Sequence, residues 1–159
     1  MSDKIDHLLA VDLGVRTGLA LYGSNGRLRW YRSKNFGSAS RLKRAVHGLL
    51  VEPDTLTWLV LEGGGSLATI WEREAERCDI SVRQINADTW RQQFFYAREH
   101  RSGSQAKQTA DTMARKVIEW SGAAKPTSLR HDAAEAILIG LWGVLHVGWL
   151  EQLPPELRR

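Results

Sequence analysis

The sequence predicts an α/β fold in which helices flank a five-stranded mixed sheet. Three observations lead to this prediction. Short apolar runs near the N-terminus are separated by turn residues and follow no helical period. From Ser38 onward, apolar residues recur at helical spacing, and the helical segments alternate with two further strand-like runs. This order of elements is typical of a mixed sheet with helices on its faces.

Residues 8 to 33 are predicted to form a three-stranded antiparallel meander. The first strand is an apolar run that closes at Asp12 and Gly14. The turn residues Gly23 to Gly26 separate the second strand from a partly alternating third strand. The predicted strands cover Leu8 to Val11, Thr17 to Tyr22 and residues 28 to 33.

The remaining elements alternate between helices and strands. Leu42 and Val46 belong to an apolar series at helical spacing that starts at Ser38 and that Pro53 ends. The strongly apolar run Leu56 to Leu61 is a fourth strand. The later elements are a charged helix from Leu67 to Cys78, a strand from Ser81 to Ile85, a short helix that Asp88 caps, a helix from Ala106 to Trp120 and a last helix from Asp132 to Val147.

Length, charge and cysteine content limit the classes of protein to which this chain can belong. A chain of 159 residues is expected to form one domain, residues 1–159, which needs neither disulfides nor a structural metal. A lone cysteine and an N-terminus without an apolar signal-like core predict a cytoplasmic location. The longest uncharged apolar run, Ala136 to Leu150, is too short for a membrane span and predicts a buried helix. A net charge of +4 is compatible with nucleic acid as a partner.

Four acidic residues stand where a solvated surface charge is not the natural expectation. Asp12 ends the first strand and Glu62 ends the fourth, while Asp132 and Glu135 share one face at the start of the last helix. If the first and fourth strands are neighbours, the carboxylates converge at one edge of the sheet. Each residue also has a plainer interpretation, because Asp132 fits a helix cap and the two strand ends fit turns.

Clustered carboxylates repel one another, and divalent cations remove that conflict. Mg²⁺ prefers oxygen ligands, and two such ions about 4 Å apart can activate a water and stabilise the leaving oxygen of a phosphodiester. The predicted chemistry is therefore two-metal phosphodiester hydrolysis, with the four carboxylates as ligands and Asp12 as the bridging ligand.

Three motifs carry a resemblance to a known family. They are Asp12-Leu13-Gly14-Val15-Arg16-Thr17-Gly18, Leu59-Val60-Leu61-Glu62 and Asp132-Ala133-Ala134-Glu135-Ala136. Over about residues 8 to 147, the chain resembles the RuvC-type Holliday junction resolvases of the RNase H-like superfamily. The resemblance implies an RNase H-like fold, two Mg²⁺ or Mn²⁺ ions per active site, and symmetric nicks made across a four-way DNA junction by a homodimer.

The resemblance also implies a role for Lys107 and a cellular setting. Lys107 opens a helix after a polar stretch and resembles the family's basic residue near the scissile phosphate, although by itself it fits an exposed surface charge. Glu135 stands where the family more commonly has aspartate, and three glycines follow Glu62 where the family's dimers use a long helix. The implied setting is a bacterial cytoplasm, with the protein associated with the nucleoid or encoded by a phage.

The segment from residue 91 to 130 carries eight Lys or Arg residues against three acidic ones. Beside a carboxylate cleft, such a segment would hold phosphates, with binding that weakens steeply as salt rises. Part of it also fits a solvated helix face, and His131 fits a solvated histidine. The predicted DNA-binding residues are Arg91, Arg98, Arg101, Lys107, Arg115, Lys116, Arg130 and His131.

Exposed aromatic side chains can stack on unpaired bases. Most of the seven tryptophans, including Trp58 and Trp142, are expected in the core. The candidates for DNA contact are Trp71 and the group formed by Phe94, Phe95 and Tyr96.

The leading hypothesis is a metal-dependent, structure-selective DNA endonuclease of the junction resolvase type. Shared carboxylates do not choose the substrate, so a nuclease acting on flaps, other branched DNA or RNA/DNA hybrid stays open. A catalytically silent DNA-binding module is the alternative from another class. The four carboxylates argue against it, because a pure binder gains nothing from negative charge that faces phosphate.

Overall fold

The computed structural model describes residues 5–100 and 102–159. Its sheet has five strands in the order β3-β2-β1-β4-β5. β1 pairs antiparallel with β2, and β2 with β3, whereas β1 and β4, and β4 and β5, pair in parallel. The strands are β1 His7–Asp12, β2 Arg16–Gly23, β3 Leu28–Asn35, β4 Leu56–Glu62 and β5 Ser81–Ile85. The predicted five-stranded mixed sheet with an antiparallel first half is confirmed.

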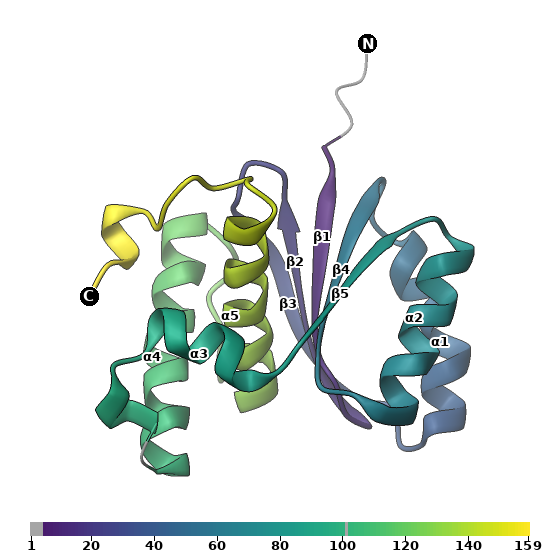
Figure 1. The fold of residues 1–159 in the computed structure, drawn as a ribbon, viewed down its shortest axis with the longest axis horizontal. Helices are drawn as coiled ribbons and strands as arrows, with labels where there is room; N and C mark the ends of the chain where they lie inside the picture. The colour runs from purple at the N-terminus through teal and green to yellow at the C-terminus, as the bar shows by residue number, and fades with distance from the viewer. Residues whose placement is uncertain (1–4, 101) are drawn as a thin grey trace.

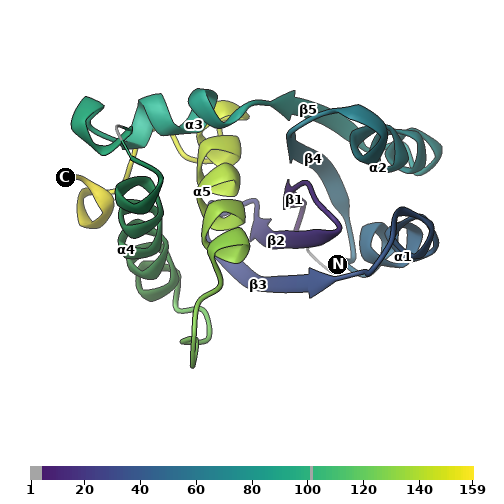
Figure 2. The same cartoon turned by 90° about the horizontal axis from the view of Figure 1, so that it is seen from below.

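Helices cover both faces of this sheet. α1 and α2 lie side by side on one face, α5 lies on the other, and α3 and α4 pack outside α5 (Figures 1 and 2). The helices are α1 Ala39–Val51, α2 Gly65–Arg77, α3 Ala87–Phe94, α4 Gly103–Ser121 and α5 His131–His146, with short 3₁₀ helices η1 Ala97–His100 and η2 Pro155–Leu157.

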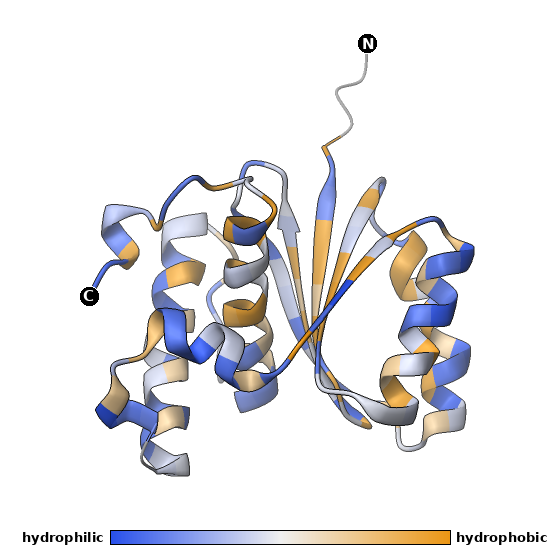
Figure 3. Ribbon diagram, in the orientation of Figure 1, coloured by the Kyte–Doolittle hydropathy of each residue, from blue (hydrophilic) through white to orange (hydrophobic). Residues whose placement is uncertain are grey.

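Alternate residues of β1 lie in two separate hydrophobic cores, because successive side chains of a strand point to opposite faces of the sheet. Leu8 and Ala10 pack with the buried residues of α4 and α5, while Leu9 and Val11 pack with those of α1 and α2. A strand covered on both faces reads as a continuous apolar run. Figure 3 shows this concentration of hydrophobic residues along β1 and α5.

The last helix is enclosed on all sides. Residues 133 to 144 of α5 are all buried, because the sheet covers one side of the helix and α3 and α4 cover the other (Figure 2). The predicted buried helix is thereby confirmed as far as Val144, whereas α5 ends at His146 and the last residues of the apolar run, 147–150, lie beyond it. Among the described residues, no helix combines the length and the apolar character that a membrane crossing requires.

Capping residues explain why α3 and α4 start earlier than the sequence predicts. The cap of α3 is Asn86, whose side chain accepts a hydrogen bond from the Thr89 amide at 3.0 Å, so Asp88 falls in the first turn and is not the cap. α4 begins three residues earlier than predicted, because the Ser102 hydroxyl accepts a hydrogen bond from the Gln105 amide at 3.2 Å.

A buried carboxylate ties the end of the chain to the segment between α3 and α4. Glu99 is 5 % exposed and forms an ion pair with both terminal nitrogens of Arg159. It also accepts hydrogen bonds from the Tyr96 amide (2.7 Å) and the Thr109 hydroxyl (3.1 Å). These contacts, that with Arg159 foremost, lower the pKa of Glu99 to about 2.

Glu99 should therefore make the protein sensitive to acid. Because its folded pKa lies below its ordinary value of 4.5, its contribution to stability is complete above that pH and is lost as pH falls toward about 2. We expect Glu99→Gln to lower the free energy of unfolding at pH 7 by about 2–3 kcal/mol and to flatten its fall below pH 4.5, measured by urea denaturation. The control is Glu52→Gln, which removes an exposed pair with Arg32 and should cost less than about 1 kcal/mol. Equal losses in both variants would contradict the assignment.

Candidate active site

Two carboxylates meet because two parallel strands end together. Asp12 is the last residue of β1 and Glu62 the last residue of β4, and the two are direct partners in the register of the parallel pair. The predicted condition, that the first and fourth strands are neighbours, is thus met. Both side chains lie at the carboxyl edge of the sheet, where ligands bind in α/β folds.

The third carboxylate comes from α5, and Gly18 lets this helix approach. Gly18 is the β2 partner of Asp12. A Cβ built on Gly18 would lie 1.9 Å from the backbone oxygen of Asp132, so only glycine fits beneath the first turn of α5. This close approach brings Glu135, which is 6 % exposed, next to the two strand ends.

Asp12, Glu62 and Glu135 form a compact group of three carboxylates. Each offers one oxygen, and these oxygens all lie within 4.8 Å of one another. Asp132 stands beside this group. One of its oxygens accepts a hydrogen bond from the Ser33 hydroxyl at 3.0 Å, and the other accepts one from the Ala133 amide at 2.7 Å. The structure therefore brings three of the four predicted ligands together, whereas the carboxylate of the fourth, Asp132, is hydrogen-bonded to Ser33 and to the Ala133 amide.

The group is electrostatically strained. Burial, followed by the negative charges of Glu135, Glu62 and Asp132, raises the pKa of Asp12 to about 8. Burial also raises the pKa of Glu62, in spite of a hydrogen bond from Trp90. Without a cation, Asp12 therefore holds a proton at neutral pH.

Glu135 has the opposite shift because the side chains of His131 and Arg91 bind it. Burial favours its protonated form, but the His131 hydrogen bond and charge, together with Arg91, outweigh burial and lower its pKa. His131 Nε2 lies 2.7 Å and Arg91 Nη2 lies 3.0 Å from the same oxygen, Oε1. Arg91 and His131 were predicted as DNA-binding residues, and the structure places both on a carboxylate of the cluster.

Sequence reasoning missed two residues that orient the carboxylates. Trp90 is fully buried and its indole nitrogen donates to Glu62 Oε2 at 2.9 Å. Ser33, on β3, donates to Asp132. A buried indole N–H needs a hydrogen-bond acceptor, and this requirement was the available signal for Trp90. The sequence pattern could not identify which residue is the acceptor. Ser33 carried no signal, because its partner lies 99 residues away.

The donor set fits a divalent cation. Three carboxylates supply the hard oxygen ligands that Mg²⁺ and Mn²⁺ prefer, and the charge of a cation there would offset both the burial and the repulsion that raise the pKa of Asp12. The residues that would hold one ion directly are Asp12, Glu62 and Glu135.

The other predicted DNA-binding residues do not form one group. Arg130 is exposed at the cap of α5, directly before His131, and Lys107 is exposed in the first half of α4. α4 and α5 start at the same end of the molecule (Figure 1). Arg115 and Lys116 are exposed in the second half of α4. From its start, α4 runs toward the opposite end of the molecule (Figure 1). Arg98 is exposed with its guanidinium 5.0 Å from the centre of the Tyr96 ring, and Arg101 lies outside the described residues.

Most of the aromatic candidates for DNA contact are wrong. Trp71 is fully buried because it lies on the face of α2 that packs against the sheet, and Phe94 and Phe95 are only 5 % and 6 % exposed. Tyr96, at 44 % exposure, is the member of the group that stays a candidate. The core placement of Trp142 is confirmed.

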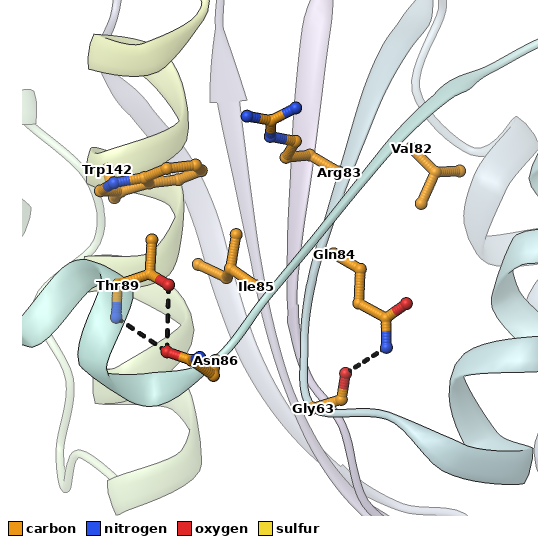
Figure 4. A pocket seen from close by; sticks show the side chains of 8 residues that line it. All are labelled: Gly63, Val82, Arg83, Gln84, Ile85, Asn86, Thr89 and Trp142. Carbon is orange, nitrogen blue, oxygen red and sulfur yellow. Dashed lines mark hydrogen bonds between the residues drawn. The ribbon is translucent and has the colours of Figure 1, made fainter.

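A groove of about 630 Å³ runs along β5, beginning next to the carboxylates. Gly63, which follows Glu62, lies at one end of it, and Trp142 reaches in from α5 (Figure 4). Gln84 donates to the Gly63 carbonyl at 2.6 Å, and Asn86 accepts from Thr89. The lining is Gly63, Val82, Arg83, Gln84, Ile85, Asn86, Thr89 and Trp142.

The chain shares its fold with two solved resolvases. RuvC of T. thermophilus, in complex with a Holliday junction substrate, superposes with a TM-score of 0.58 at 13% sequence identity, covering 89% of this chain and 95% of that one. The yeast mitochondrial Holliday junction resolvase Ydc2 superposes with a TM-score of 0.61 at 10% identity, covering 91% and 81%. No protein-family model and no curated protein matches the sequence. The RNase H-like, RuvC-type fold that the sequence predicted is confirmed.

Proposed function

We propose that this protein is a metal-dependent DNA endonuclease that resolves four-way (Holliday) junctions. One observation carries the proposal: Asp12, Glu62 and Glu135 meet within 4.8 Å at the carboxyl edge of a sheet with the RuvC-type fold. Clustered carboxylates that face a polyanion serve metal-ion chemistry and oppose simple DNA binding.

The proposed site holds two Mg²⁺ or Mn²⁺ ions, with Asp12 as the shared ligand and Asp132 completing the set. Bound there, the ions would activate a water and stabilise the leaving oxygen of a phosphodiester. Glu62 is held by the Trp90 indole, and Glu135 by Arg91 and His131, so both carboxylates keep their orientation before metal arrives. Asp132 would exchange its hydrogen bond from Ser33 for a metal ion.

Two groups of basic residues would contact different parts of the DNA. Arg130, His131 and Lys107 would contact the phosphates around the cut, and Lys107 would lie near the scissile phosphate. Arg98, Arg101, Arg115 and Lys116 would hold the backbone farther along the junction arms, mainly through counterion release. Symmetric nicks need two active sites, so the active form is a homodimer of residues 1–159. Its proposed location is the bacterial cytoplasm, in association with DNA.

The experiment is a cleavage assay on four labelled substrates of equal length: a four-way junction, a flap, a linear duplex and an RNA/DNA hybrid. Each is incubated with Mg²⁺, Mn²⁺ or EDTA. We expect paired nicks on the junction, in Mg²⁺ or Mn²⁺ only, and no cleavage by Glu135→Gln. Preference for the flap or hybrid would replace the resolvase assignment with another nuclease activity, and metal-independent binding without cleavage would favour a silent DNA-binding module.

Light scattering tests the dimer. A mass near twice 17.9 kDa, alone or on junction DNA, is the expected result. A monomer under both conditions would rule out symmetric cutting by a preformed pair of sites.

A further inference from the structure

A second group of metal-ligating side chains lies on the face of the sheet that α1 and α2 cover, opposite α5. α1 and α2 run side by side there (Figure 2), and three residues meet between them: His47 from α1, and Glu74 and Cys78 from α2 and its C-cap. Glu74 and Cys78 are four residues apart and so share one face of the helix. One ligand atom from each residue lies within 4.8 Å of the other two.

The three ligand atoms are already close to the spacing of a tetrahedral site. His47 Nδ1 is 2.7 Å from Glu74 Oε1, and Cys78 Sγ is 3.9 Å from that nitrogen and 4.0 Å from that oxygen. Zinc–ligand bonds of about 2.0–2.3 Å place tetrahedral ligands about 3.3–3.6 Å apart. Shifts of about half an ångström would therefore complete the geometry.

One oxygen of Glu74 is directed at the other two ligands, and solvent reaches the group. Arg77 contacts Glu74 through the other carboxylate oxygen, Oε2, at 3.4 Å, so Oε1 faces His47 and Cys78. The His47 side chain is 61% exposed and that of Glu74 19% exposed, so solvent can supply a fourth ligand. The packing of α1 against α2 thus already brings three protein ligands together.

The mixture of ligands selects the kind of metal. Mg²⁺ and Ca²⁺ take oxygen ligands, whereas a thiolate, an imidazole and a carboxylate together suit Zn²⁺ and related borderline ions such as Co²⁺. The site is therefore chemically distinct from the all-carboxylate cluster around Asp12.

We propose that His47, Glu74 and Cys78 bind one Zn²⁺-class ion, with water as the fourth ligand. The bound ion links α1 to α2 and stabilises the folded state by mass action, because the two halves of the site come together only on folding. This role is independent of any nuclease activity.

The test uses Co²⁺ as a spectroscopic probe. Cys78 is the only cysteine in the sequence, so a thiolate-to-cobalt charge-transfer band can arise only from this residue. We expect the band to appear with one Co²⁺ per chain, independently of protein concentration, and Zn²⁺ to abolish it. Zn²⁺ at about 100-fold above its Kd should raise the Tm by about 5–10 °C.

Three variants separate this site from others. His47→Ala, at an exposed position, should weaken Co²⁺ binding at least about 10-fold without loss of the far-ultraviolet circular dichroism of the fold, and Cys78→Ser should remove the band. Asp12→Asn should leave the band unchanged. Absence of the band in the wild-type protein, or a band that His47→Ala does not weaken, would overturn the proposal.

Discussion

Asp12→Asn is expected to abolish DNA cleavage, by at least about 10³-fold, while it makes the metal-free protein more stable. The loss of cleavage follows from the removal of a carboxylate that belongs to the cluster and that we propose as the shared metal ligand. Initial rates on the four-way junction in Mg²⁺ measure it.

The gain in stability follows from the raised pKa. Between its ordinary pKa of 3.8 and the folded value of about 8, Asp12 keeps a proton in the folded protein that the unfolded chain has released. The stability of the metal-free protein must therefore fall as pH rises from about 4 to about 8, and it levels off above that. Asparagine cannot ionise, so Asp12→Asn should raise the free energy of unfolding at pH 8 by on the order of 3 kcal/mol and the Tm by about 5–10 °C.

The matched control is Asp54→Asn, an exposed aspartate in the connection before β4. It should change neither the cleavage rate nor the pH dependence of stability, because surface substitutions of this kind stay within about 0.5 kcal/mol. Thermal unfolding of both variants in EDTA at pH 5 and pH 8 provides the comparison. A variant at Asp12 that is inactive but less stable than the wild type at pH 8 would show that the carboxylate is structural.

The strands and two of the carboxylates could be predicted because their signals are local. A buried parallel strand is a continuous apolar run, and the polar residue that ends it lies at the sheet edge, so Asp12 and Glu62 were readable from their own neighbours. Glu135 was readable from its helical spacing to Asp132. Here the local pattern and the global fold agree.

Most of what the sequence could not show depends on contacts between distant residues. Asp132 has the same local signal as Glu135, but its carboxylate lies beside the cluster and accepts a hydrogen bond from Ser33, two strands away in the sheet from β1. Arg91 reads as one more positive charge in a basic segment, yet its partner is Glu135, 44 residues later. For Trp71 a signal existed, since Ala68, Trp71 and Ala75 form the buried stripe of α2.

Gly18→Ala is expected to damage both folding and function. An alanine Cβ would lie 1.9 Å from the Asp132 carbonyl oxygen and 2.4 Å from its carbon, and both are backbone atoms that no rotamer change can move. The first turn of α5 must therefore retreat from β2 and take Glu135 away from Asp12. Because forced overpacking of this kind costs about 1–3 kcal/mol or more, we expect a loss of at least about 3 kcal/mol in urea denaturation.

The effect of Gly18→Ala on cleavage should exceed its effect on the folded fraction. A displacement of about 1 Å in a catalytic group can cost 10²-fold in rate, so we expect at least that loss on the junction at a temperature where circular dichroism shows the variant folded. Gly48→Ala is the control, since a Cβ at Gly48 within α1 meets no atom within 4 Å and alanine favours a helix by about 0.5–1 kcal/mol. That variant should be more stable than the wild type and fully active. If Gly18→Ala were equally stable and active, the close approach of α5 to β2 could not be what holds the carboxylates together.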